Sequence, residues 1–365
     1  MFVPPLLLAG LASCTLLLAQ SPPSAGWRAA IAAETAKVLD GLDAADVGLV
    51  VGVYRNGEFE FETAGKRKVD AETLFEIGSI TKVYTAVALA DASLERDAAK
   101  PLSLDDPIAR WLPADAVVPT RGERAITLRD LARHSSGLPR LPPGFRPADP
   151  TDPYADFDAK RLLEALATTK LRRDVGSGYE YSNYGSGLLG HLLAGRDGLG
   201  YEAMLRARVL APLKLTDTWI ALPEAAAKRL APGHDASGKP AANWRFDALA
   251  GAGALRASAR DVLKFAAANL AAAKPDADGA VPSRITQALR LCQRTERVGN
   301  GPQELGLGWH LGGPTDGRFL WHNGGTAGYR SFLGIDLAAG TAVVALVNCS
   351  RSVDAIGAAA IGSIR

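Results

Sequence analysis

Ser79 and Lys82 are a pair of residues whose types and spacing could do chemistry. They form the only Ser-x-x-Lys in the sequence and open a long apolar run with helical patterning. Residues three apart share one face of a helix, so we expect the hydroxyl and the amine to lie side by side. A serine hydroxyl needs a base to take its proton, and a partly desolvated amine can be that base because desolvation lowers its pKa. The alternative is an accidental pair of surface residues at this spacing.

A second candidate group, Tyr181-Ser182-Asn183, follows a glycine-rich loop and precedes a helical pattern over residues 185–193. A phenol normally titrates near pH 10, so Tyr181 would need a cationic neighbour to act as a base at neutral pH. Lys82 could supply that charge. The alternative is a tyrosine that packs its ring and an asparagine that forms a turn.

The third group is His322-Asn323-Gly324-Gly325, directly after a short strand pattern. Glycines at a strand edge can bring a backbone N–H close to a substrate carbonyl. Together with the N–H of Ser79 at the start of its helix, one such group would complete an oxyanion hole. Alternatively, Gly324 and Gly325 form only a tight turn, and His322 is a hydrogen-bonded spacer.

The elements that must position these groups are strands at both ends of the chain and helices between them. An apolar run over residues 47–54 and an alternating run over residues 58–62 flank Asn56-Gly57, a strong hairpin signal. Strand patterns return over residues 318–321, 329–335 and 341–347. We therefore predict an α+β fold, in which one antiparallel sheet is built from N- and C-terminal strands, helices flank it, and a mostly helical subdomain is inserted.

In this division, residues 26–365 form one hydrolase domain. Its α/β part comprises about residues 26–98 and 300–365, and its helical part about residues 99–299.

The order of the three groups resembles that of the class C β-lactamase, DD-peptidase and serine esterase superfamily of penicillin-recognising enzymes. Further segments are similar to blocks of that superfamily, and together they span about residues 45 to 350. They are Phe75–Lys82, Ile126–Leu138, Gly253–Phe265, Leu305–Trp309 and His322–Gly334. Neither the Ser-Asp-Asn and Lys-Thr-Gly of class A enzymes nor a Gly-x-Ser-x-Gly nucleophile elbow occurs in the chain.

The resemblance implies a role for each candidate residue. Ser79 would be acylated, Lys82 and Tyr181 would share the proton transfers, and Tyr181 would be the base that activates water in deacylation. Asn183 would orient Lys82 or the substrate amide. The backbone N–H groups of Ser79 and Gly325 would form the oxyanion hole.

His322 stands where β-lactamases of this superfamily often have a lysine. An unperturbed imidazole is mostly neutral at pH 7, so the usual cation for a substrate carboxylate is weakened. Arg330 could restore a positive charge if it faces the cleft, although its place in an alternating strand favours solvent.

Composition sets bounds on partners and cofactors. The chain has 365 residues and a formal net charge of +2, with acidic and basic residues interleaved, so we expect no nucleic-acid partner. Neither Cys-x-x-Cys nor His-Glu-x-x-His occurs, and we expect no metal and no organic cofactor. Cys292 and Cys349 could pair if they lie close together, or remain buried thiols.

Residues 1–25 carry no charge and hold an apolar core followed by a polar, small-residue segment. This pattern is typical of a secretory signal peptide, and we expect a periplasmic or secreted protein. An uncleaved membrane anchor and a lipoprotein signal at Leu11–Cys14 are the alternatives, so N-terminal membrane association stays open.

We therefore predict an exported serine hydrolase that cleaves an amide or ester through an acyl-enzyme on Ser79. Its substrate would be a β-lactam, a D-amino-acid peptide derived from peptidoglycan, or a small ester. The alternative is a catalytically idle envelope protein that binds β-lactams or peptidoglycan. The sequence indicates no oligomeric state.

Overall fold

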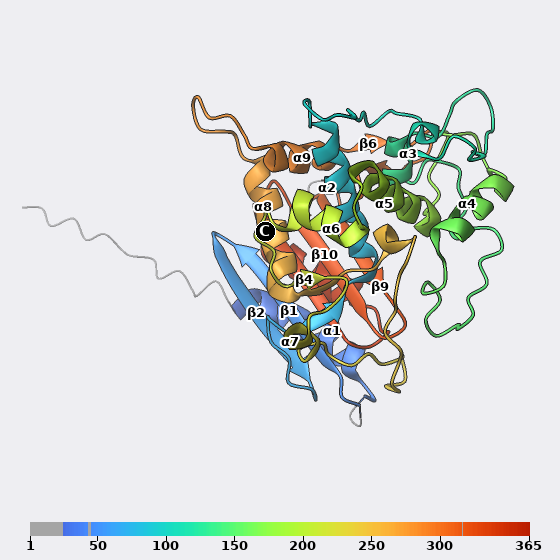
Figure 1. The fold of residues 1–365 in the computed structure, drawn as a ribbon. Coiled ribbons are helices and arrows are strands. Elements are labelled where there is room, and N and C mark those ends of the chain that lie inside the picture. The colour runs from blue at the N-terminus through green and yellow to red at the C-terminus, as the bar shows by residue number, and fades with distance from the viewer. Residues whose placement is uncertain (1–24, 43–44, 316) are drawn as a thin grey trace, which may run out of the picture.

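The structure is a computed structural model that describes residues 25–42, 45–315 and 317–365 (Figure 1). Its largest element is an antiparallel sheet with strand order β2-β1-β11-β10-β9-β8-β7-β6. In that order the strands are β2 (Glu58–Gly65), β1 (Gly48–Arg55), β11 (Thr341–Val347), β10 (Arg330–Asp336), β9 (Phe319–Gly325), β8 (His310–Gly312), β7 (Glu304–Leu305) and β6 (Glu296–Arg297). A smaller sheet has the order β3 (Leu74–Glu76), β5 (Arg256–Ser258) and β4 (Thr218–Trp219). N-terminal strands thus pair with C-terminal strands, which confirms the predicted α+β fold.

Helices cover both faces of the large sheet. On one face lie α1 (Ala25–Leu39) and α10 (Asp354–Ser363), which contact each other. On the other face α8 (Ala259–Ala273) packs on β1, β10 and β11, and α9 (Arg284–Gln293) packs on α8 and on α2 (Thr81–Ser93).

The remaining helices gather beside this sandwich, where Figure 1 shows α3, α4 and α5 together on the right. They are α3 (Leu128–Ala132), α4 (Ala159–Thr168), α5 (Asn183–Asp197), α6 (Tyr201–Leu205) and α7 (Glu224–Ala227), with short turns over Gly78–Ile80, Ile108–Trp111, Arg206–Leu210 and Ala250–Ala252. The boundaries at residues 99 and 299 stay a prediction. The helix α8 falls within the predicted helical part, between residues 99 and 299, and yet it packs on the large sheet. The helical part and the α/β part therefore share an interface.

The central strand β11 explains why the sheet forms where it does. All of its residues are buried, because both faces of the sheet are covered. Val343, Ala345 and Val347 contribute to the apolar cluster under α1 and α10, whereas Val344 and Leu346 contribute to the cluster under α2 and α8. A continuous apolar run is the pattern expected of a strand in this position.

The hairpin between β1 and β2 turns at Asn56-Gly57, as predicted. Asn56 has φ 54° and Gly57 has φ 89°. Positive φ at both central residues is the feature that matches a two-residue turn to the twist of its strands.

Cys292 and Cys349 are both buried, free thiols, so the two do not form a disulfide. Within the described part of the chain, none of the helices is both long enough and apolar enough to span a membrane. The leader predicted over residues 1–25 lies, apart from Ala25, outside the described residues.

The packing of β11 gives a prediction for stability. Val344 is fully buried, whereas Val281 is 89% exposed, so the same truncation to alanine should have different effects at the two positions. We expect Val344→Ala to lower the free energy of unfolding by about 2 kcal/mol. Val281→Ala should change it by less than about 0.5 kcal/mol. Urea unfolding measures both, and equal effects would contradict this account of the core.

Candidate active site

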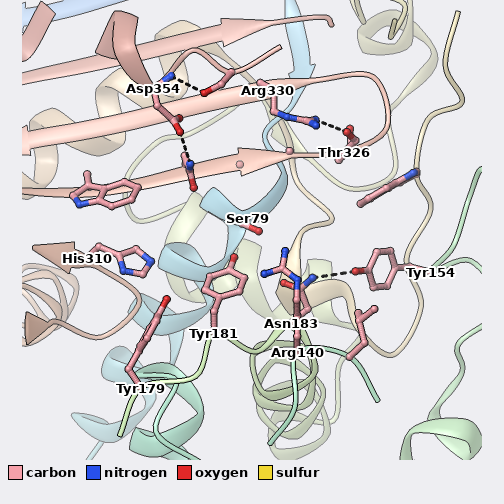
Figure 2. Close-up of a pocket in the computed structure, with 17 residues that line it drawn as sticks. Ser79, Arg140, Tyr154, Tyr179, Tyr181, Asn183, His310, Thr326, Arg330 and Asp354 are labelled. Atoms are coloured by element: carbon pink, nitrogen blue, oxygen red, sulfur yellow. Dashed lines mark hydrogen bonds between the residues drawn. The ribbon is translucent and has the colours of Figure 1, made fainter. Parts of the chain in front are cut away.

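Ser79 lies in the short turn Gly78–Ile80 that leads into α2, and its side chain lines a cleft of about 670 Å³ (Figure 2). The turn is held from two sides. Ile77 N–H donates to Leu255 O at 3.0 Å, and Leu255 N–H donates to Thr81 Oγ1 at 3.1 Å. The hydroxyl is therefore presented to the cleft by a backbone segment that is fixed to the β5 region.

Lys82 lies one helical turn after Ser79, as its spacing predicts. Its Nζ is 2.9 Å from Ser79 Oγ and donates to Ala252 O at 2.5 Å. The side chain is 3% exposed, and none of the ion pairs among the described residues involves it. Burial, together with the nearby charge of Arg140, holds the pKa of Lys82 well below its usual value. The amine is therefore suited to accept a proton rather than to act as a permanent cation.

Tyr181 completes a three-residue group with Ser79 and Lys82. Lys82 Nζ lies 5.0 Å from the centre of the Tyr181 ring, and the phenol forms a hydrogen bond with Ser79. Burial raises the pKa of Tyr181, and the Ser79 hydrogen bond and the charge of Arg140 oppose that effect only in part. A raised pKa favours the protonated phenol at neutral pH, and the role of Tyr181 as the base in deacylation stays a prediction.

Asn183 begins α5, directly after the Ser182 cap, whose Oγ accepts a hydrogen bond from Gly185 N–H at 2.8 Å. Asn183 Nδ2 donates to Tyr154 Oη at 3.0 Å, whereas Asn183 Oδ1 is buried without a hydrogen-bond partner. The structure therefore shows no hydrogen bond between Asn183 and Lys82. Asn183 lines the cleft, and its Oδ1 is a buried acceptor that no protein group satisfies.

The strand β9 passes very close to the turn Gly78–Ile80, which carries Ser79. Gly78 has φ +50°, and a Cβ built at this position would lie 2.5 Å from Gly325 N. Only glycine allows this approach, which brings the backbone N–H groups near Ser79 and Gly325 to the same end of the cleft. Ser331 on the neighbouring strand β10 holds this turn against the sheet, because its Oγ donates to Ile77 O at 2.8 Å.

His322 does not line the cleft but is buried beside it, with its ring centre 6.2 Å from that of Tyr181. Alternate residues of the strand β9 are buried, so Trp321, Asn323 and Gly325 lie on its partly exposed side while His322 is fully buried. Its Nδ1 is 2.6 Å from Asn323 O, and its Nε2 has no partner. Burial and the nearby His310 and Lys82 hold its pKa well below the usual value, so His322 supplies no cation for a substrate carboxylate.

Several cleft residues were not singled out by the sequence. Tyr154, Trp244 and His310 line the cleft together with Arg140. Arg330 also lines it, contrary to the alternation argument, and its guanidinium donates to the carbonyls of Thr326 and Tyr329. These residues come from loops and strand ends, where no periodic pattern marks the side that faces a cleft.

His134 fixes the loop that carries Tyr181. It adopts φ 55°, and its Nδ1 accepts a hydrogen bond from Ser182 N–H at 3.2 Å. His310 lies between this loop and β9, with its ring centre 5.0 Å from that of His322 and 6.4 Å from that of Tyr181. Burial and the charge of Lys82 lower the pKa of His310 to about 4.

No group of three His, Cys, Asp or Glu side chains suited to a metal ion occurs among the residues that the structure describes. A hydroxyl held beside a buried amine is an arrangement suited to nucleophilic attack, with the amine as base.

This fold and this site define a serine hydrolase of the Ser-x-x-Lys type. Residues 35–363 match the family described as Beta-lactamase, and the chain belongs to that family. It is thereby placed in the superfamily of penicillin-recognising serine hydrolases, as the sequence motifs predicted.

Known relatives differ in the activity that their names give. A β-lactamase of Pseudomonas fluorescens is 29% identical over 276 residues, which cover 72% of this chain and 69% of that protein. The D-alanyl-D-alanine-carboxypeptidase/endopeptidase AmpH of Escherichia coli K12 is 27% identical over 269 residues, covering 72% of this chain and 67% of that protein. Among solved structures, a class C β-lactamase from Rhodobacter sphaeroides aligns with a TM-score of 0.73 and 25% identity, over 92% of this chain and 98% of that one.

The close approach at Gly78 gives a prediction for activity. A methyl group there should push β9 away from the nucleophile turn, so we expect Gly78→Ala to lower the acylation rate at least about tenfold. Gly340→Ala is the matched control, because Gly340 also has a positive φ of 68° but no atom within 4 Å of a built Cβ. It should cost stability and leave acylation unchanged. Stopped-flow acylation measures both, and equal rates in the two variants would contradict the argument.

The buried imidazoles of His134, His310 and His322 give a prediction for stability against pH. Burial lowers the pKa of each in the folded state, whereas in the unfolded chain they titrate near 6.5. The unfolded state therefore binds more protons below about pH 6.5, so stability is greatest above that pH and falls as the solution is acidified.

For His310 this loss runs from about pH 6.5 to about pH 4 and amounts to at most about 3 kcal/mol. We expect His310→Gln to lose less stability than the unmodified protein between about pH 7.5 and pH 4.5 in urea unfolding. An identical loss in both proteins would show that His310 is not held neutral by burial.

Proposed function

We propose that the protein hydrolyses an amide or ester bond through an acyl-enzyme on Ser79. The observation that carries the proposal is the 2.9 Å distance between Ser79 Oγ and the Nζ of Lys82, an amine that is buried and whose pKa is depressed. An amine in this state can take the proton of the hydroxyl as it attacks a carbonyl carbon.

The proposed reaction has two halves. Ser79 Oγ bonds to the substrate carbonyl carbon while its proton passes to Lys82 Nζ, and the oxyanion is stabilised by the N–H groups of Ser79 and Gly325. The tetrahedral intermediate collapses, and the leaving group departs with a proton relayed from Lys82 through Tyr181. Water then adds to the carbonyl carbon of the acyl-enzyme ester and gives a proton to Lys82 Nζ. The bond between that carbon and Ser79 Oγ breaks, Lys82 returns the proton to Ser79 Oγ, and the acid product leaves.

We propose narrower roles for Tyr181 and Asn183 than those that the sequence resemblance implied. Because the pKa of Tyr181 is raised, we assign it the relay of a proton to the leaving group and assign Lys82 the part of the base in both halves. Asn183, through its unpartnered Oδ1, would accept a hydrogen bond from a substrate amide. His322 would act on substrate only indirectly, and Gly324 would allow β9 to approach the turn at Ile77.

The names of the relatives suggest the first substrates to test, namely β-lactams and peptides that end in D-alanyl-D-alanine. Small esters are the third class, because an acyl-enzyme forms more readily from an ester than from an amide. We also propose that the protein is exported to the periplasm or beyond, on the signal-like composition of residues 1–25. Binding without turnover is less well supported, because a binding module has no use for a neutral amine beside a hydroxyl.

Covalent labelling tests the nucleophile. We expect a fluorophosphonate or a fluorescent penicillin to label the protein, and Ser79→Ala to abolish the labelling. Ser237→Ala, a change in an exposed turn, is the control and should label normally. Persistent labelling of Ser79→Ala would exclude Ser79 as the nucleophile, and a labelled enzyme that never releases its acyl group would favour the binding role.

The charge state of Lys82 can be tested with a variant that keeps the cation. Lys82→Arg retains a positive charge that cannot be given up at accessible pH. If Lys82 is the base, the variant should lose acylation by at least about a hundredfold. Circular dichroism and urea unfolding check that the variant is folded. A folded variant with near-normal acylation would show that the site needs only a positive charge.

A further inference from the structure

Arg140 is a cleft cation that contacts none of the reacting atoms in the proposed reaction. It lines the same cleft as Ser79, on the wall formed by the helical part of the molecule (Figure 2). Its guanidinium carbon lies 5.1 Å from the centre of the Tyr181 ring. The charge is therefore close to the reacting groups without being one of them.

The backbone of Arg140 is held firmly in this position. Its carbonyl oxygen accepts hydrogen bonds from Asn183 N–H at 3.0 Å and from Tyr184 N–H at 3.2 Å. The preceding carbonyl, that of Pro139, accepts a hydrogen bond from Ser182 Oγ at 2.7 Å. The loop is thus fastened to the start of α5, the same place from which Tyr181 and Asn183 reach the cleft.

The guanidinium of Arg140 has no carboxylate partner among the described residues. By contrast, three arginines that precede the same loop each bind a carboxylate. They are Arg124 with Asp130, Arg129 with Asp105, and Arg133 with Glu296. An arginine left without such a partner, beside a nucleophile and on a fixed loop, keeps its planar array of donors free for a ligand.

Other charges of the cleft are already engaged. Arg330 donates to two backbone carbonyls, and Asp354 accepts a hydrogen bond from Asn323 Nδ2 at 2.9 Å on the opposite, sheet side. Figure 2 shows Asp354 across the cleft from Arg140. Burial and the charge of Arg140 itself hold the pKa of Lys82 well below its usual value. At the helical wall, Arg140 is therefore a guanidinium with no carboxylate partner among the described residues.

We propose that Arg140 is a specificity-determining residue that binds a carboxylate carried by the substrate, so that the enzyme prefers monoanionic substrates over neutral ones of the same shape. The inference rests on the proposed function and deepens it by giving the substrate a charge. Two parallel N–H···O bonds from one guanidinium match one carboxylate, and they fix orientation as well as adding affinity.

The test compares esters that differ only in charge. One pair is 4-nitrophenyl hydrogen glutarate and its methyl ester, which place or remove a carboxylate on the acyl side. The second pair is 3-acetoxybenzoate and its methyl ester, which do the same on the leaving-group side. Rates are corrected for hydrolysis without enzyme, and kcat/KM is measured for the unmodified protein, Arg140→Gln, Arg140→Lys and Arg146→Gln.

Arg146→Gln is the matched control, because Arg146 is exposed in the same loop and does not line the cleft. We expect Arg140→Gln to lower kcat/KM for the carboxylate member of one pair about tenfold or more beyond the loss on its neutral partner, chiefly through KM. Any effect of Arg140 on the pKa of Lys82 is common to both members of a pair, so the ratio between them reports the carboxylate alone. Arg140→Lys should recover part of the loss, and added salt should reduce the preference of the unmodified enzyme.

Two results would overturn the inference while leaving the proposed function intact. An equal loss on charged and neutral esters, with a shifted pH profile of kcat, would mean that Arg140 acts only through Lys82 and Tyr181. An unchanged preference in both pairs would mean that the carboxylate is bound elsewhere or not at all. Failure of the proposed function is a different observation, namely that the unmodified protein turns over none of the esters and takes no covalent label.

Discussion

The site depends on the lysine amine of Lys82, which is buried beside a serine. Among the residues that the structure describes, no carboxylate pairs with this amine. Placing a charged ammonium in such a position costs several kcal/mol, and the protein avoids that cost if the amine is neutral. Among the described residues, Lys82 Nζ forms hydrogen bonds only with Ser79 Oγ and Ala252 O, and Arg140 adds a further charge that disfavours protonation. The same burial that would destabilise a cation thus creates a base of the right strength for a hydroxyl.

Most of the fold serves to keep this amine out of water and its hydroxyl in reach. The helix α2 places the two side chains one turn apart, and both faces of the large sheet are covered, so α2 lies in the main apolar cluster. The missing side chain of Gly78 lets β9 close one side of the site, and the cap at Ser182 brings Tyr181 and Asn183 to the other side. Three distant segments of the chain therefore meet at one hydroxyl.

The sequence predicted those parts of the molecule that have a strong local pattern. The apolar run of β11, the Asn56-Gly57 turn and the Ser-x-x-Lys spacing each follow from near-neighbour rules, and the sheet built from both termini follows from where the strand patterns lie. It was harder to predict which side chains of the loops and strand ends face the cleft. Arg330 lines the cleft although its strand pattern favoured solvent, His310 lines it without a motif that marked it, and His322 is fully buried. Arg140 carried no motif, because a loop residue is placed by tertiary contacts that no periodicity records.

The charge state of Lys82 is the claim on which the mechanism rests, and NMR can measure it directly. The protein would be labelled with ¹³C at the ε-carbon of lysine, and its spectrum titrated with pH, with Lys82→Arg used to assign the Lys82 signal. The account predicts that this signal titrates well below the ordinary value of about 10.4, so that the amine is neutral at pH 7. A Lys82 signal that titrates at or above that value would contradict it, because the amine would then be a fixed cation and another group would have to be the base.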